Sequence, residues 1–139
     1  AKVDDDINKS NVDFVVGDAM KLMDISTLAE NGPYDAILLS NLMCRLTHPI
    51  ECLEYFTKND AYIKKGGVLV FASPNTWMAQ YTDASLFLDG ASNEQTLQKL
   101  GALLPGFTRL HEEDLPFMIR EHRRKYEYIV SQVSVWRKN

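Results

Sequence analysis

The sequence predicts an α/β protein in which strands and helices alternate before the chain closes in an antiparallel pair of strands. Two short runs, 36–39 and 68–72, are entirely apolar, as strands are when they lie inside a parallel sheet with both faces covered. An amphipathic helix pattern separates these runs, and a second one follows the later run. The last two predicted strands, 107–115 and 126–137, have no helix-length connection between them, which predicts an antiparallel hairpin.

The composition is that of one ordinary globular domain of 139 residues, with 45% apolar and 24% charged residues. No apolar run approaches the roughly 20 residues of a membrane-spanning helix, and the net charge of −4 argues against nucleic-acid binding. Two cysteines are too few for a disulfide scaffold, so we expect a reducing, cytoplasmic environment. Two cysteines and three scattered histidines predict no metal site.

The N-terminal part of the chain predicts a short strand over 12–16, closed by Gly17-Asp18-Ala19. The segment 20–31 has a moderate helical or irregular pattern, and Gly32-Pro33 ends it. The apolar strand that follows ends abruptly in small polar residues, Ser40 and Asn41. Ligands of open α/β sheets bind just beyond the carboxyl ends of the central strands, so a site is expected there.

The middle of the chain predicts a helix that begins at Thr47-His48-Pro49, because proline suits the first helical position. We expect this helix to end near Lys64-Lys65, with Gly66-Gly67 turning the chain into the strand 68–72. The segment 76–90 is long and rich in aromatic residues, which is typical of a lid or a binding loop.

A second helix is predicted by the capping box formed by Ser92 and Gln95. Leucines at helical spacing share one face of this helix, and Pro105-Gly106 ends it. The predicted element order is therefore strand, helix, strand, helix, strand, helix, hairpin.

A parallel sheet that ends in an antiparallel hairpin is the mark of class I S-adenosylmethionine (SAM)-dependent methyltransferases. Gly17-Asp18-Ala19 resembles the motif of that family whose acidic residue binds the adenine amino group. The stretch 64–70, Lys-Lys-Gly-Gly-Val-Leu-Val, resembles the turn into the fifth strand of that family. The resemblance implies a Rossmann-like sheet and SAM as the cofactor.

Four further stretches resemble one subfamily, the methyltransferase domain of ovothiol synthases (4-mercaptohistidine N1-methyltransferases). In the order of the subfamily they are 41–46 (Asn-Leu-Met-Cys-Arg-Leu), 73–77 (Ser-Pro-Asn-Thr-Trp), 115–122 (Leu-Pro-Phe-Met-Ile-Arg-Glu-His) and 133–137 (Val-Ser-Val-Trp-Arg). The resemblance covers most of the chain from Val12 onward. It implies methylation of an imidazole nitrogen on a thiol-bearing histidine, within ovothiol biosynthesis.

The sequence departs from the family in what precedes Val12, where the first strand, the glycine-rich loop and the ribose-binding acid would lie. The iron-dependent sulfoxide synthase domain of the bifunctional enzymes has no counterpart either. We therefore expect residues 1–139 to be one partial methyltransferase domain, the C-terminal part of the fold. A missing N-terminal segment or a second chain is then needed to complete the sheet. Asn75 stands where an aromatic residue is expected.

The candidates for cofactor binding flank the two strand ends and are Gly17, Asp18, Ala19, Ser40 and Asn41. A carboxylate just past a strand can accept a hydrogen bond from an exocyclic amine, although an Asp after Gly is equally typical of a turn. Asn41 offers an amide beside the expected reacting centre and is also a catalytic candidate. The alternative is that Asn41 satisfies backbone groups at the strand end.

Three adjacent residues between the predicted hairpin strands are candidates for the methyl acceptor site. Arg120 suits a carboxylate clamp, Glu121 suits an ammonium group, and His122, the second catalytic candidate, suits orienting an imidazole or taking its proton. The alternative is a solvated charge run, which we prefer for the residues 123–125.

Arg45, Trp77 and Tyr81 complete the candidates for substrate binding. Arg45 is a further carboxylate candidate, or else a surface cap. Trp77 and Tyr81 suit the walls of a pocket that faces a sulfonium, or else they are core or lid aromatics.

Methyl transfer to a neutral imidazole depends on positioning more than on a strong base. Our leading hypothesis is an enzyme that methylates a histidine derivative with SAM. The second is a class I methyltransferase with another small acceptor, and the third is a non-catalytic fragment that serves as an assembly module. The expected partner is a small molecule, not a nucleic acid or a membrane.

Overall fold

The computed structural model describes residues 6–7 and 10–139 of the chain. It contains three α-helices, three short 3₁₀ helices and four strands in this part of the sequence. In chain order the helices and strands are α1 (Ser26–Asn31), β1 (Tyr34–Ser40), α2 (Pro49–Thr57), β2 (Ile63–Ser73), α3 (Asn93–Ala102), β3 (Phe107–His122) and β4 (Lys125–Lys138), with 3₁₀ turns at Leu22–Asp24, Met43–Arg45 and Ala84–Leu86. Among the described residues, no helix is long and apolar enough to cross a membrane.

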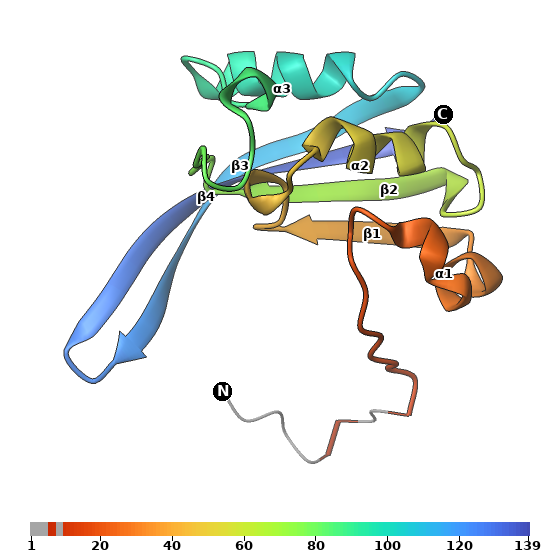
Figure 1. Ribbon diagram of the computed structural model, residues 1–139, viewed down its shortest axis with the longest axis horizontal. Coiled ribbons are helices and arrows are strands. Elements are labelled where there is room, and N and C mark those ends of the chain that lie inside the picture. The colour runs from red at the N-terminus through yellow and green to blue at the C-terminus, as the bar shows by residue number, and fades with distance from the viewer. Residues whose placement is uncertain (1–5, 8–9) are drawn as a thin grey trace.

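The four strands form one mixed sheet in the order β1-β2-β4-β3 (Figure 1). β1 and β2 are parallel, whereas β4 pairs antiparallel with both β2 and β3. The helix α2 connects the parallel pair, as the crossover between parallel strands requires. The predicted parallel sheet with a terminal antiparallel hairpin is therefore confirmed.

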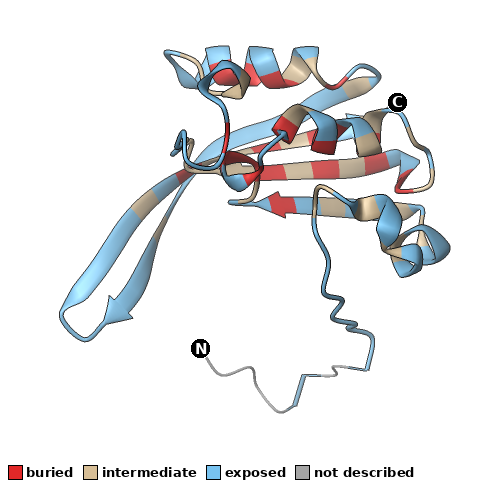
Figure 2. Ribbon diagram, in the orientation of Figure 1, coloured by how far each residue is buried: buried red, intermediate tan, exposed pale blue. Residues whose placement is uncertain are grey.

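The hydrophobic core lies on the face of the sheet that α2 and α3 cover (Figures 1 and 2). The strands contribute Leu39, Leu69, Phe71 and Trp136 to this face, and each is at most 6% exposed. From α2, Cys52, Leu53 and Phe56 pack onto them, and from α3, Leu97 and Leu100. We call this side the covered face.

The opposite side, which we call the open face, is apolar as well, but no described segment covers it. By strand alternation and register it consists of Ala36, Leu38, Val68, Val70, Ala72, Val133 and Val135, all of them partly or largely exposed. Leu38 is 64% exposed, whereas its neighbour Leu39 is 6% exposed. The prediction that both faces of this strand are covered is wrong for the described chain, because α2 and α3 lie on the same side.

The predicted strand over 12–16 does not form, and this expectation is corrected. The segment has no regular structure and runs away from the sheet (Figure 1). Phe14 is 94% exposed and Val16 is fully exposed. A strand is stable only when its backbone pairs with a neighbour, and this segment pairs with none of the described strands.

The predicted end of the second element also differs. α2 ends at Thr57, and an Asx turn follows in which Asn59 accepts a hydrogen bond from the amide of Ala61. Lys64-Lys65 and Gly66-Gly67 belong to β2, where the register with β1 shifts between Tyr34 and Ala36. The chain therefore turns before these glycines, and Gly66 supplies a left-handed backbone (φ +80°) to the irregular pairing.

The capping box at the start of α3 is confirmed, except that Gln95 binds the backbone amide of Ala91 instead of that of Ser92. The Ser92 hydroxyl accepts from the amide of Gln95, and the Gln95 side chain accepts from the amide of Ala91.

The hairpin is longer than predicted, because β3 continues to His122 and only 123–124 form the turn. Pairing between β2 and β4 ends at Ser73 and Gln132, so the rest of the hairpin extends beyond the sheet (Figure 1). We call the residues 115–130 the arm. The cluster 120–122 thus lies within β3 and not between the strands. The strand continues past Pro116 because β3 is at the edge of the sheet, where a proline is tolerated.

Candidate active site at the ends of the parallel strands

The two parallel strands end in asparagines with the same unusual backbone. Asn41 follows β1 with φ 51°, and Asn75 follows β2 with φ 53°. Both angles lie in the left-handed region, which non-glycine residues seldom adopt and Asn tolerates best. Because Ser40 pairs with Ala72, and the Asn41 amide donates to the Ala72 carbonyl (2.7 Å), the two asparagines flank one edge of the sheet.

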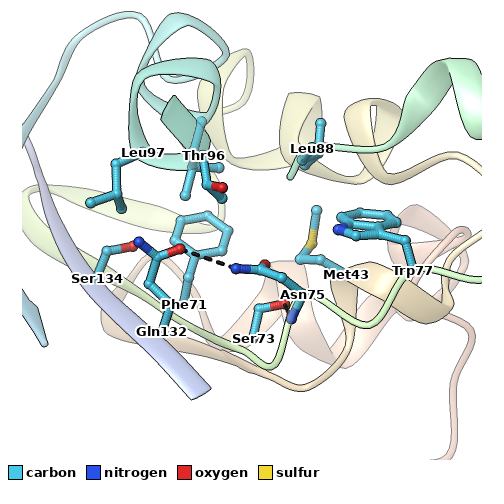
Figure 3. Close-up of a pocket in the computed structure, with 11 residues that line it drawn as sticks. Met43, Phe71, Ser73, Asn75, Trp77, Leu88, Thr96, Leu97, Gln132 and Ser134 are labelled. Atoms are coloured by element: carbon cyan, nitrogen blue, oxygen red, sulfur yellow. Dashed lines mark hydrogen bonds between the residues drawn. The ribbon is translucent and has the colours of Figure 1, made fainter. Parts of the chain in front are cut away.

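The base of the hairpin closes this edge through two side-chain hydrogen bonds. The Ser131 hydroxyl donates to Asn41 Oδ1 (3.1 Å), and Asn75 Nδ2 donates to Gln132 Oε1 (3.1 Å; Figure 3). The Asn41 carbonyl is therefore held in place, while its Nδ2 has no partner among the described residues. An exposed amide on a fixed side chain is available to a bound ligand.

Ser131, Gln132 and Asn75 were not among the predicted site residues. The usable signal was the pattern in which an asparagine follows each apolar strand within two residues of its end. Asn75 was noted only as a departure from the family, although its left-handed backbone explains why a bulkier residue is unfavourable there.

A small cavity lies beside this edge, between the covered face and the segment after β2 (Figure 3). Its volume is about 30 Å³, and its lining includes Met43, Phe71, Asn75, Trp77 and Gln132. The space suffices for water but not for an aromatic ring. A substrate ring enters here only if the segment between β2 and α3 moves.

Trp77 has a buried indole Nε1 without a hydrogen-bond partner among the described residues. The ring stacks on Phe87, with centroids 5.4 Å apart, and its nitrogen lies on the side toward Met43 (Figure 3). An unsatisfied buried donor is unfavourable, so a water or a ligand acceptor in the cavity would stabilise it.

Arg45 and Tyr81 lie together, but the guanidinium is already engaged. It donates to the Thr76 carbonyl (2.7 Å) and the Cys44 carbonyl (3.0 Å), and it stands 5.3 Å from the centre of the Tyr81 ring. Arg45 therefore fastens the turn after β1 to the segment after β2. As placed, it supports the cavity wall and is not free to clamp a carboxylate.

The predicted adenine-binding stretch lies beside β1, on the covered face. Ala19 and Leu42 line the same apolar pocket, which has a volume of about 160 Å³. Asp18 forms the turn that its alternative interpretation predicted, because its Oδ1 accepts from the amide of Met20 (2.9 Å). Its second carboxylate oxygen is exposed and has no described partner. Gly17 packs so closely on Ile25 that a Cβ would clash with that side chain.

Arg120, Glu121 and His122 do not converge on this edge. They lie at the far end of the arm, six or more residue pairs beyond Gln132, which corresponds to roughly 20 Å. Glu121 pairs with Lys125 (2.7 Å), and the His122 Nδ1 accepts from the amide of Arg124 (3.3 Å).

The carboxyls on the arm influence one another. The hydrogen bond from Lys125 lowers the pKa of Glu121, and the hydrogen bond to Glu121 raises the pKa of Glu127. This behaviour is that of a solvated charge cluster. No group of three or more potential metal ligands occurs in the described part of the chain.

Comparison with known proteins identifies the fold but no family. No protein-family model matches the sequence, and no curated protein matches it. A solved structure titled "Conversion of a Disulfide Bond into a Thioacetal Group during Echinomycin Biosynthesis" matches with a TM-score of 0.57 and 14% identity, over 91% of this chain and 55% of that one. This chain therefore shares the Rossmann-like α/β fold of that structure and spans about half its length.

Proposed function

We propose that the chain is part of a SAM-dependent methyltransferase that acts on a small molecule. The observation that carries this proposal is the pair of left-handed asparagines at the carboxyl ends of the parallel strands. In open α/β sheets this edge is where ligands bind. The fold likeness to a structure from echinomycin biosynthesis supports the same assignment.

In this proposal the adenine amino group donates to the exposed Asp18 carboxylate, and the methyl end of SAM points toward Asn41. The Asn41 amide, oriented by Ser131, holds an acceptor atom in line with the sulfonium carbon. Because such a displacement needs alignment more than proton transfer, a neutral amide on a fixed side chain suffices. Arg120, Glu121 and His122 have no role at the edge, because they lie roughly 20 Å away.

The acceptor that we propose is the imidazole of a thiol-bearing histidine. Support comes from the four stretches that resemble ovothiol synthases, two of which, 41–46 and 73–77, meet at the proposed site. An imidazole with a pKa near ~6.5 is mostly neutral at pH 7 and can attack the methyl group without a base. Its thiol-bearing ring is flat, and it would fit between the strand ends and the Trp77 side chain after the segment between β2 and α3 moves.

We further propose that an additional polypeptide segment completes the cofactor site along β1. The outer edge of β1 pairs with no described strand, and the open face beside it is apolar. An unpaired apolar strand is a template for another strand. The alternative function, an assembly module without catalysis, is favoured by the same two exposed surfaces.

The test is methyl transfer with isotopically labelled SAM, using the protein purified from its host and either 4-mercaptohistidine or histidine as the acceptor. We expect one labelled methyl group on a ring nitrogen of 4-mercaptohistidine, detected by mass spectrometry and NMR. Asn41→Gly keeps the left-handed backbone but removes the amide, and it should abolish transfer without lowering the melting temperature. Transfer by this variant at the normal rate would remove Asn41 from the mechanism.

A further inference from the structure

The arm exposes many large apolar side chains on two paired strands, and contiguous exposed apolar surface marks interaction sites. It is a two-stranded ribbon to which no described segment adds a third strand or a covering helix, an arrangement that is marginally stable on its own. Two of its large apolar residues, Phe117 and Ile129, are half-buried. The other six are nevertheless at least 43% exposed, and they are Leu115, Met118, Ile119, Tyr126, Tyr128 and Val130.

One face of the arm concentrates the aromatic and sulfur-containing side chains. Residues paired across the ribbon share a face, and the regular register joins Pro116 to Val130, Met118 to Tyr128 and Arg120 to Tyr126. Tyr, Met and Arg are the residue types that protein interfaces favour. This surface, which we call the arm face, is exposed over all of its length, with Tyr128 69% and Met118 62% exposed.

The arm face has opposite charges at its two ends. Asp114 shares the face at the base of the arm, where its carboxylate accepts only from the neutral amide of Asn93 (3.2 and 3.3 Å). Arg120 lies near the tip and makes no ion pair with any described residue. Six residues, or roughly 20 Å, separate the two charges, and the apolar side chains fill the interval.

Such a surface is complementary to itself. If two arms pack face to face in opposite directions about a two-fold axis between Pro116 and Met118, each Arg120 meets the Asp114 of the other copy. Two charge-assisted pairs then flank an apolar centre, as an isologous interface requires. We propose that the arm face binds a second copy of this chain in this antiparallel arrangement. The inference does not rest on the proposed enzymatic function.

Pairing of the two arms through their β3 edges is less favourable than face-to-face packing. Pro116 lies in the edge strand and cannot donate a backbone hydrogen bond, and the register shifts at both ends of the strand. Packing of the exposed side chains removes on the order of 1,000 Å² from water over both copies, the lower end for specific interfaces. The dimer should therefore be weak and depend on concentration.

The experiment is sedimentation velocity on the chain from roughly 1 µM to a few hundred µM, the range in which a weak dimer dissociates. We expect a reversible shift from monomer to dimer. Asp114→Arg and Arg120→Asp should each weaken association by at least about tenfold, because like charges then face one another at both ends. Mixing the two variants in equal amounts should restore association, since each bad pair becomes a good one.

Matched controls change the same chemistry on the opposite face of the ribbon. Glu113→Arg and Leu115→Ser should leave the dimerisation constant unchanged, because alternate residues of a strand point to opposite faces. Circular dichroism checks that every variant keeps its strands.

Three results would overturn the proposal. They are a chain that remains monomeric at the highest concentration, association that Asp114→Arg and Arg120→Asp leave intact, and failure of their mixture to associate. Association that Leu38→Lys alone abolishes would assign the contact to the open face instead. Binding of the arm to a polyanion without dimerisation would assign the basic tip to an acidic partner.

Discussion

The two faces of the sheet have almost the same apolar character but opposite environments. Along β1, Leu39 is 6% exposed beneath α2, and the adjacent Leu38 is 64% exposed on the other side. The covered face holds the hydrophobic core, whereas the open face contributes little to the stability of this chain. Apolar side chains that remain exposed after folding are available for association. The contribution of each face to the free energy of unfolding can be measured one residue at a time.

The largest expected effect comes from truncating the same residue type on the two faces. Leu39→Ala should lower the free energy of unfolding by about 3 kcal/mol, because it removes buried methyl groups and leaves a cavity. Leu38→Ala should change it by less than about 1 kcal/mol. Urea denaturation followed by circular dichroism measures both values. Equal losses would mean that another part of the protein covers the open face in solution.

The second prediction uses the pH dependence of the covered side. Burial raises the pKa of the Cys52 thiol from 9.0 to about 11. Below pH 9 the folded and unfolded states both keep the proton, and between pH 9 and about 11 only the unfolded state loses it. Stability should therefore fall by about 2 kcal/mol as the pH rises through this window.

Chemical denaturation at a series of pH values measures this loss. Cys52→Ala should remove this part of the slope, whereas Cys44→Ala should retain it. A slope that is identical in all three proteins would show that Cys52 is not the titrating group.

The third prediction concerns the proposed contact between Asp18 and the cofactor. Asp18→Ala should weaken SAM binding to the protein with its sheet completed by about 1–3 kcal/mol, the usual loss for a hydrogen bond to a charged group. Asp24→Ala, an exposed acid in the neighbouring 3₁₀ turn, should leave the affinity unchanged. Calorimetric titration distinguishes them. Micromolar binding by residues 1–139 alone would show instead that these residues already contain a sufficient site.

The smallest expected effect concerns α3, one of the two helices that pack on the covered face. Ser92→Ala removes the side-chain cap of α3 and should cost about 1 kcal/mol of stability. Ser26→Ala in α1 is the control, because no side-chain cap is present at the start of that helix. If the two variants have the same unfolding midpoint, the cap contributes nothing to holding α3 on the sheet.

Local patterns predicted the elements whose signals lie within the element itself. The apolar runs of β1 and β2, Pro49 at the first position of α2 and the capping box at Ser92 all describe interactions within a few residues. The prediction of a strand at 12–16 was wrong because a strand depends on a pairing partner, which the local sequence does not specify. The end of α2 was placed too late because the Asx turn at Asn59 stops the helix before the glycines.

The site was predicted in part for the same reason. Ser40 and Asn41 were selected as candidates because polar residues after an apolar strand form a local pattern. The contact of Asn41 with Ser131 joins positions ninety residues apart and follows only from the strand order. The positions of Arg120, Glu121 and His122 depended on the length of β3. The predicted strand ended at 115, just before Pro116, because proline is unusual inside a strand.

The hairpin register also has a consequence in time. β3 and β4 meet through a two-residue turn, so their pairing forms on the microsecond scale of an isolated hairpin. β2 reaches β4 only after a loop of about 60 residues closes, a slower event with a larger entropy loss. We expect the arm to be paired, with its tyrosines exposed, before the parallel strands join it. Pulse-labelling hydrogen exchange during refolding should detect early protection in β3 and late protection in β1, and simultaneous protection would contradict this order.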